Sequence, residues 1–212
     1  YDEAISRYLN ATNRGETAQV ADSVISDLQA DPEVEKDPHS FFDRVIEINL
    51  SDLTPHINGP HTPDLARPVG DLGEEATANG WPLEISAGLI GSCTNSSYED
   101  ITRAAGIARD ALSKGLKSKI PLLVTPGSEQ VRATIERDGL LADLEAIGAT
   151  VLANACGPCI GQWDRQDLDD GVPNSIVTSY NRNFPKRNDG YASTFAFVTS
   201  PETVVALSIA GK

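Results

Sequence analysis

The chain has 212 residues, of which 40% are hydrophobic, and a formal net charge of -14 at pH 7. This length and composition allow a sizeable core to be buried, but the acidity argues against a nucleic-acid partner, because phosphate binding relies on a cationic surface. Apolar runs stay below the roughly 18 residues that a membrane span needs, so we expect no membrane partner either.

The first 50 residues differ in pattern from the rest of the chain. Apolar residues between positions 5 and 28 recur at spacings of three and four, which places them on one helical face, and a break at residues 13–15 divides them into two predicted helices. Pro32 and Pro38 then indicate a loop. Residues 44–50 alternate in part and are rich in β-branched side chains, so we predict a strand there.

Residues 53–80 are dominated by prolines and glycines. Because proline fixes its own backbone angle and cannot donate a backbone hydrogen bond, this pattern predicts no regular element of any length. We interpret residues 53–80 as a proline-rich linker or arm that marks a domain boundary. The residues concerned are Pro55, Gly59, Pro60, Pro63, Pro68 and Gly70.

From residue 81 onward the pattern alternates between strands and helices. Ser97 with Asp100 three residues on predicts a capped helix start, and Pro201 suits the first position of a last helix. Such alternation predicts parallel pairing with helical cover, so we expect residues 81–212 to form a three-layer α/β domain with a mainly parallel sheet. The predicted strands are 83–90, 120–125, 150–153 (buried), 175–179 and 194–199, and the predicted helices are 99–112, 128–137, 140–147 and one from residue 201.

The chain has three cysteines, and each lies in a glycine-containing loop after a predicted strand. Thiolates are soft ligands that suit iron–sulfur clusters and zinc, and three of them leave one iron of a four-iron cluster open to another ligand. An open metal position indicates catalysis rather than plain electron transfer. The cysteines are Cys93, Cys156 and Cys159.

Other interpretations of these cysteines remain open at this point. The Cys156-Gly-Pro-Cys159 sequence also resembles the thioredoxin redox motif, although no Trp precedes it and Gly161 follows where a helix should run. A structural disulfide would account for two of the three cysteines and leave one free. Cys93, considered by itself, would be an ordinary buried cysteine that packs like a small hydrophobic residue. A zinc site would need a fourth ligand, but the three histidines lack a paired metal-ligand spacing; they are His39, His56 and His61.

A group of basic residues stands out in this acidic chain at residues 179–189. In parallel sheets ligands bind beyond the carboxyl ends of strands, and Cys93, Cys156 and Asn181 each follow a predicted strand. We therefore expect all three loops to meet at one edge. There, Arg182 and Arg187 would suit oriented binding of a small polycarboxylate, because each guanidinium offers a planar fork of donors.

The roles of the polar residues in this group have simpler alternatives. The two arginines would be ordinary solvated side chains if they lay away from the cysteines. Asn181 and Asn183 would donate hydrogen bonds to a cluster or to cysteine sulfur, or else they would be turn residues.

Three motifs taken together resemble those of aconitase, most like the mitochondrial enzyme. They are Gly-Ser-Cys-Thr-Asn at 91–95, Ala-Cys-Gly-Pro-Cys at 155–159 with Gly161, and Ser-Tyr-Asn-Arg-Asn-Phe at 179–184 with Arg187. The resemblance runs through essentially the whole chain, including residues 56–60 and 125–128. It implies that the three cysteines hold a [4Fe–4S] cluster, that Arg182 and Arg187 contact substrate carboxylates, and that Asn181 lies against the cluster.

The resemblance also implies a reaction for the complete protein. This would be the reversible isomerisation of citrate to isocitrate through cis-aconitate, with the open iron as Lewis acid. The acid and base groups would lie outside these 212 residues, so we expect the chain alone to be inactive. Related hydro-lyases, homoaconitase and isopropylmalate isomerase, use a similar cluster, while RNA binding, known for a cytosolic relative, is disfavoured by the charge.

By the same resemblance, the chain is a fragment of a larger protein. Residues 1–52 would be the C-terminal part of a preceding α/β domain, and residues 81–212 the iron–sulfur-cluster-binding α/β domain. The chain contains no Met, including at position 1, and we therefore expect any targeting sequence to lie outside it. The complete protein would be a monomer in the mitochondrial matrix, with the remaining domains as partners of this piece.

Overall fold

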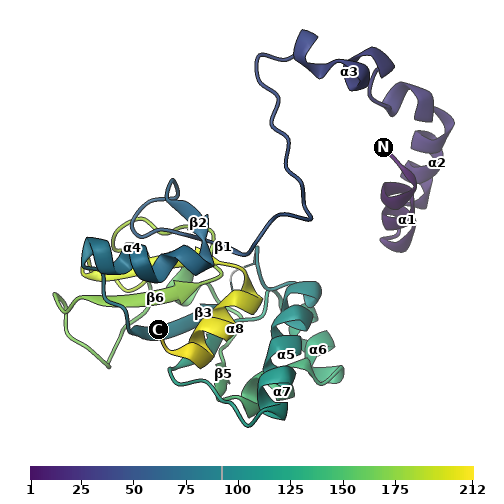
Figure 1. Ribbon diagram of the computed structural model, residues 1–212. Coiled ribbons are helices and arrows are strands. Elements are labelled where there is room, and N and C mark those ends of the chain that lie inside the picture. The colour runs from purple at the N-terminus through teal and green to yellow at the C-terminus, as the bar shows by residue number, and fades with distance from the viewer. Residues whose placement is uncertain (92) are drawn as a thin grey trace. The chain divides into compact units, whose positions relative to one another are not determined.

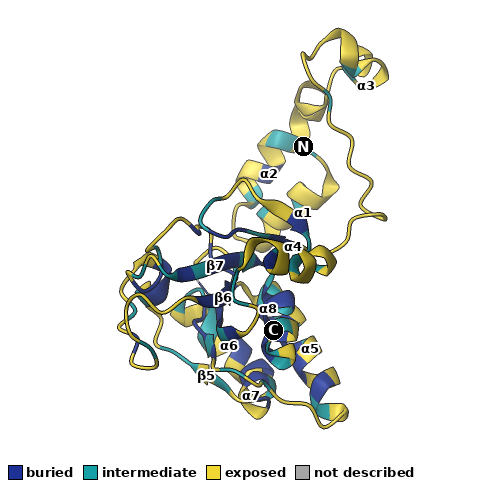
Figure 2. Cartoon of the chain, turned by 60° about the vertical axis from the view of Figure 1, so that its left-hand side comes forward, coloured by how far each residue is buried: buried dark blue, intermediate teal, exposed yellow. Residues whose placement is uncertain are grey.

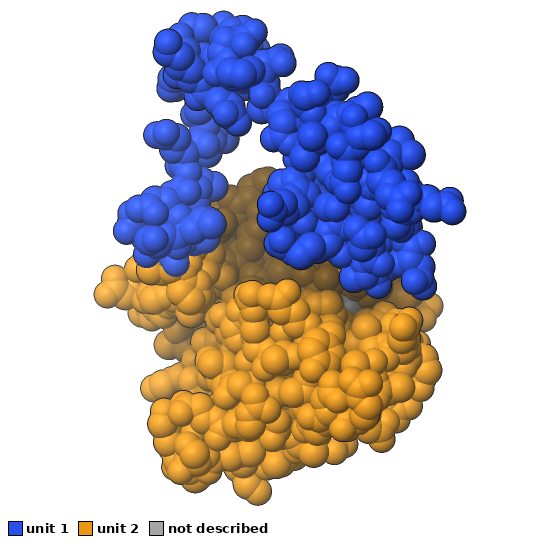
Figure 3. Space-filling view, turned by 90° about the vertical axis from the view of Figure 1, so that its right-hand side faces the viewer, with its two compact units in different colours: residues 1–53 blue, residues 54–212 orange. Residues whose placement is uncertain are grey.

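The computed structural model describes residues 1–91 and 93–212, so Ser92 of the first cysteine motif lies outside the described residues. The chain divides into two compact units, Tyr1–Leu53 and Thr54–Lys212, which Figure 3 shows in different colours. Among the described residues, none of the helices is both long and apolar enough to cross a membrane.

The first two helices of unit 1 lie where the spacing of its apolar residues predicts them. The loop predicted at Pro32 and Pro38 is wrong, because each proline begins a short helical element, at whose first position its missing N–H costs nothing. The first predicted helix begins after Asp2, whose carboxylate accepts a hydrogen bond from the Ile5 amide at 2.9 Å. The break between the two helices contains Asn13, which has a positive φ of 59°. The elements are α1 (Glu3–Ala11), α2 (Gly15–Ser23), η1 (Ile25–Leu28), α3 (Pro32–Lys36) and η2 (Pro38–Ser40).

The strand predicted at residues 44–50 is wrong, because this segment forms no regular element. A strand needs backbone partners on a neighbour, and the described residues of unit 1 provide no other strand. The segment instead leaves its large apolar side chains in solvent: Ile46 is 74% exposed, Ile48 65% and Leu50 78%.

Unit 2 is built on a seven-stranded sheet in the order β2-β1-β7-β6-β3-β4-β5 (Figure 1). The five strands from β7 to β5 pair in parallel, and β1 pairs antiparallel with both β7 and β2. This confirms the predicted α/β class with a mainly parallel sheet. The strands are β1 (His56–Asn58), β2 (Ala66–Pro68), β3 (Ile85–Ile90), β4 (Leu122–Val124), β5 (Ala149–Val151), β6 (Asn174–Thr178) and β7 (Thr194–Thr199).

Residues 53–80 contain regular elements that their prolines did not predict. Strands β1 and β2 extend the sheet beyond β7, and they are followed by η3 (Val69–Asp71) and α4 (Leu72–Asn79). Pro68 ends β2 at the outer edge of the sheet, where its missing N–H breaks no ladder hydrogen bond. Residues 54–80 therefore belong to unit 2.

One face of the sheet is covered by helices, whose apolar sides form the main core. The predicted start of the long helix is confirmed, since Ser97 and Asp100 form a capping box. Figure 2 shows the buried residues along β6 and β7 and on parts of α5. The helices on this face are α4, α5 (Tyr98–Ser113), α6 (Glu129–Arg137), α7 (Leu140–Ala146) and α8 (Pro201–Ala210).

One strand is less buried than its sequence predicts. The segment predicted as a buried strand at 150–153 forms β5, at the edge of the sheet, and its residues are partly or fully exposed. An edge strand has a neighbour on one side only, so solvent reaches it from the other.

The opposite face of the sheet is covered by two irregular loops, which form the third layer. The Cys loop, residues 152–173, follows β5 and contains η4 (Gly157–Ile160), and the Arg loop, residues 179–193, follows β6. Cys159 and Tyr180 pack from these loops against apolar residues of the central strands, and Trp163 packs beside them. The apolar residues beneath them are Ala87, Leu89, Ile176 and Ala196.

Candidate metal centre

The three cysteines line one cavity of about 250 Å³ at the carboxyl edge of the parallel strands. Cys93 follows β3, and Cys156 and Cys159 follow β5. Asn181 and Arg187 line the same cavity. The structure thus brings five of the six predicted site residues together. The cavity is also lined by Thr125, Pro126, Gly127, Asn154, Ala155 and Ile160.

The sixth predicted site residue, Arg182, does not line this cavity. Its side chain is exposed, and Nη1 donates a hydrogen bond to the Asn181 carbonyl oxygen at 2.9 Å. Of the two arginines, only Arg187 therefore shares the cavity with the thiols.

The loop that carries Cys93 is tied to the start of the Arg loop. The Gly91 amide donates to Ser179 Oγ at 3.0 Å, and Asn95 Nδ2 donates to the Ser179 carbonyl oxygen at 2.7 Å. Asn181 Nδ2 donates to Thr94 Oγ1 at 3.4 Å. These hydrogen bonds hold Cys93 and Asn181 on adjoining stretches of backbone, so the two residues reach the cavity together.

The Cys loop makes one tight turn between its two thiols. The Cys159 amide donates to the Cys156 carbonyl oxygen at 2.8 Å, and η4 ends at Gly161, whose φ is +84°. A Cβ at Gly161 would lie 3.2 Å from the Arg187 carbonyl oxygen. Glycine is therefore needed here both for its positive φ and for the close approach of the Arg loop.

All three cysteines are free, with Cys93 and Cys156 exposed and Cys159 buried. The ordinary buried cysteine considered for Cys93 is therefore wrong. Burial raises the pKa of the Cys159 thiol, and the nearby Arg187 guanidinium lowers it to a smaller extent. A thiol whose pKa is raised is a poor redox nucleophile, whereas a metal ion would bind it as the thiolate.

The Arg187 side chain lies between an aromatic ring and the cysteines. Its guanidinium carbon lies 5.3 Å from the centroid of the Phe184 ring, and its Nε is buried without a hydrogen-bond partner among the described residues. A buried donor left unpaired costs on the order of 1–3 kcal/mol. Arg187 also lines the cavity of the thiols, where an anion would meet its positive charge.

Three thiols around one cavity are a soft donor set, of the kind that suits zinc or an iron–sulfur cluster. Within residues 1–91 and 93–212, no three His, Cys, Asp or Glu side chains come together closely enough to hold one ion. The histidines His56 and His61 do not line the cavity, and His39 belongs to unit 1. A single zinc ion is therefore disfavoured, whereas a cluster takes one thiolate on each of several irons and spreads its ligands around its body.

Sequence reasoning missed the polar groups that lie behind this site. Arg165 of the Cys loop and Asp189 of the Arg loop form an ion pair in which both side chains have 0% exposure. Neither residue belongs to a periodic pattern or a short motif. The only available signal was the presence of charged residues close to the cysteines and to Arg187.

Comparison of the sequence with known proteins identifies the family of this chain. Residues 1–211 match the model of the aconitase family (aconitate hydratase). The chain is 60% identical over 211 residues to the mitochondrial aconitate hydratase of Emericella nidulans and 57% identical over 212 residues to that of Saccharomyces cerevisiae. It is also 58% identical to a probable mitochondrial aconitate hydratase of Caenorhabditis elegans. Each match covers 100% of this chain and 26% of the relative.

Proposed function

The chain belongs to the aconitase family, and from this premise we propose that the complete protein is an aconitate hydratase of the mitochondrial matrix. It would interconvert citrate and isocitrate through cis-aconitate. The observation that carries the proposal is the cavity shared by the three free thiols and Arg187. The names of the relatives, mitochondrial aconitate hydratases, support the reaction and the location.

The cofactor of this reaction would be a [4Fe–4S] cluster held by Cys93, Cys156 and Cys159. With one thiolate on each of three irons, the cluster when bound would supply a fourth iron as Lewis acid for the hydroxyl and carboxylate of the substrate. The chain's own contribution is to hold the three thiolates around one cavity. Asn181, which lines the same cavity, would donate a hydrogen bond toward the cluster or a cysteine sulfur.

The substrate would be held by the arginines of the Arg loop. Arg187 lines the cavity, where its guanidinium would donate to a substrate carboxylate. Arg182 does not line the cavity, but it is the neighbour of Asn181, which does. From that position Arg182 would contact a second carboxylate of the substrate. The groups that move the proton would come from other parts of the complete protein.

The experiment that tests this proposal uses the complete protein purified without oxygen. We expect visible absorption, about four irons and four sulfides per chain, and conversion of citrate to isocitrate. The 212-residue chain alone serves as the inactive control. Thiol–disulfide exchange without iron would instead support the dithiol interpretation of Cys156 and Cys159, and a preference for homoaconitate or isopropylmalate would support a related hydro-lyase.

A second expected result concerns removal of iron. Because three thiolates leave one iron without a cysteine ligand, mild oxidation of the complete protein should release that iron first and abolish turnover. Ferrous iron with a reductant should restore both, and bound citrate should slow the loss by occupying the same iron and Arg187. Iron analysis and activity measured on the same samples check this. Release of all the iron in a single step would contradict the three-ligand assignment.

We also propose that residues 1–52 are the C-terminal part of a preceding α/β domain in the full protein. The apolar side chains Ile46, Ile48 and Leu50 are exposed here, and the rest of that domain would cover them. Backbone amides of 44–50 should therefore exchange hydrogen much more slowly in the complete protein than in the 212-residue chain. Strand β3 is the control, since it should be protected in both. Equal exchange of 44–50 in the two proteins would contradict the proposal.

A further inference from the structure

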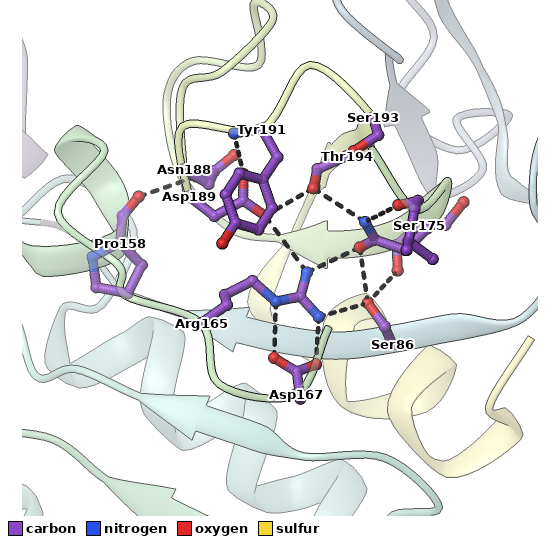
Figure 4. A network of polar contacts seen from close by, with 12 residues as sticks. Ser86, Pro158, Arg165, Asp167, Ser175, Asn188, Asp189, Tyr191, Ser193 and Thr194 are labelled. Carbon is purple, nitrogen blue, oxygen red and sulfur yellow. Dashed lines mark hydrogen bonds and ion pairs between the residues drawn. The ribbon is translucent and has the colours of Figure 1, made fainter. Parts of the chain in front are cut away.

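The Cys loop and the Arg loop are joined by a buried polar network centred on Arg165 (Figure 4). Arg165 Nη1 lies 3.4 Å from Asp189 Oδ2, and both side chains have 0% exposure. Within its own loop, Arg165 Nε donates to Asp167 Oδ1 at 3.0 Å. The guanidinium also lies over the Trp163 ring, 4.6 Å from its centroid. Arg165 thus bridges the two loops at a point away from solvent.

The same network is fixed to the sheet. Arg165 Nη1 donates to Asn174 Oδ1 at 2.8 Å, and Nη2 donates to Ser86 Oγ at 3.2 Å. Asp189 Oδ2 accepts from Thr194 Oγ1 at 2.6 Å. Asn174 and Thr194 are the first residues of β6 and β7, so the network lies at the amino edge of the parallel strands, opposite the edge that carries the cysteines. Arg165 therefore holds the two loops where they return across the sheet.

The network reaches the candidate site through the residues next to Arg187. Asn188 is buried, and its Nδ2 donates to the Pro158 carbonyl oxygen at 3.0 Å, between Cys156 and Cys159. Asp189 follows directly. The two residues after Arg187 are thus both fixed: Asn188 is held by the Cys loop, and Asp189 is held by Arg165. The Arg187 carbonyl oxygen also lies close to Gly161.

We propose that Arg165 is a positioning residue, whose buried contact with Asp189 sets where Arg187 lies relative to the thiols of Cys156 and Cys159. Long irregular loops have few ladder hydrogen bonds to fix their relative placement, and a buried charge pair provides one defined register. Without this pair, the Asn188 hydrogen bond to Pro158 and apolar packing would be left to fix the Arg loop along the Cys loop. The proposal rests on the proposed function for its consequence in catalysis, but the placement of the loops is measurable without it.

The test compares variants of the complete protein. Arg165→Gln removes the charge, and Arg165→Gln combined with Asp189→Asn removes both charges, so that no buried carboxylate is left unpaired. Arg165→Lys keeps the positive charge but replaces the planar guanidinium, with its several N–H donors, by a single ammonium group. The control is Arg109→Gln, which makes the same substitution in a solvent-exposed Arg–Asp ion pair on the helix-covered face, where Arg109 Nη1 lies 2.6 Å from Asp143 Oδ2.

The first measurement is hydrogen exchange in the iron-free protein. We expect peptides covering 156–161 and 184–190 to exchange at least roughly tenfold faster in Arg165→Gln and in the double variant, with β3 and α5 unchanged. Arg165→Lys should lie between these variants and the wild type, and Arg109→Gln should match the wild type in both peptides. Wild-type exchange in the two peptides, or faster exchange spread equally over the whole unit, would overturn the proposal.

The second measurement is steady-state kinetics on the same variants loaded with iron. A displaced Arg187 binds the substrate carboxylate poorly, so KM for citrate should rise by roughly tenfold or more, while kcat per loaded enzyme falls less. An unchanged KM in a variant that folds would overturn the proposal. If Arg165→Gln does not fold, the double variant and Arg165→Lys decide. Absence of turnover in the wild type would refute the proposed function, while the exchange result would still decide the role of Arg165.

Discussion

Replacing Cys159 with serine in the complete protein should abolish both iron binding and turnover. A serine hydroxyl is a hard ligand that stays protonated at neutral pH, so the iron facing position 159 would lose its anchor. The loss should be complete rather than partial, because Cys159 is the buried thiol of the three and a hydroxyl in its place would face apolar neighbours. Iron and sulfide content, visible absorption and citrate turnover measure the result.

Serine at Cys93 or at Cys156 should have the same effect, since each would hold a different iron. Thr125→Ser is the matched control, because it removes one methyl group from the wall of the same cavity and no ligand. A Cys93→Ser protein that keeps its full iron and sulfide content would refute the three-ligand assignment. It would also revive the interpretation in which only Cys156 and Cys159 act together, as a dithiol.

Substitution of Arg187 by lysine should lower kcat/KM for citrate by roughly 5- to 150-fold, or about 1–3 kcal/mol of transition-state stabilisation. An ammonium group is a point charge that cannot form the two parallel hydrogen bonds of a guanidinium with a carboxylate. The iron content should stay at the wild-type value, because none of the three cysteines proposed as cluster ligands is changed.

The control for this substitution is Arg137→Lys on α6, where the arginine is 71% exposed and pairs with its neighbour Asp138. It should leave the kinetics unchanged. Arg182→Lys, measured in parallel, reports on the second proposed carboxylate contact. A wild-type kcat/KM in Arg187→Lys would show that Arg187 does not touch the substrate, even though it lines the cavity with the thiols.

Much of the fold follows from local signals in the sequence. The capping box of Ser97 and Asp100 fixes the start of α5, and the apolar runs at residues 83–90 and 194–199 contain the whole of β3 and β7. The failures have a common physical cause. Residues 44–50 have strand propensity but no partner in unit 1, and β5 is exposed because it lies at an edge. Propensity is local, whereas pairing and burial depend on neighbours that a sequence window does not contain.

The candidate site divides in the same way. That Cys93, Cys156 and Asn181 line one cavity follows from a rule of topology, since each comes after the carboxyl end of a strand in a parallel sheet. The same rule does not predict where an individual long side chain points. Arg182 and Arg187 were both expected in the cavity, but only Arg187 lines it. Pairing of Arg165 with Asp189 was equally out of reach, because it joins two loops through a contact 24 residues apart in sequence.

The helices of unit 2 cover one face of the sheet, and the cysteines lie with the loops on the other. We therefore expect the helical face to tolerate stabilising substitutions better than the loop face does. Substitutions that improve packing beneath α5, α7 or α8 act on a core that does not include the cysteines, and the effects of distant, independent changes usually add. Stabilising substitutions placed in that core should therefore leave the cavity of the thiols unchanged. Substitutions in residues 152–173 or 179–193, on the other face of the sheet, change the packing of the loops and the proposed metal site together. Variants in these loops that are selected for thermal stability therefore have to be tested for turnover as well.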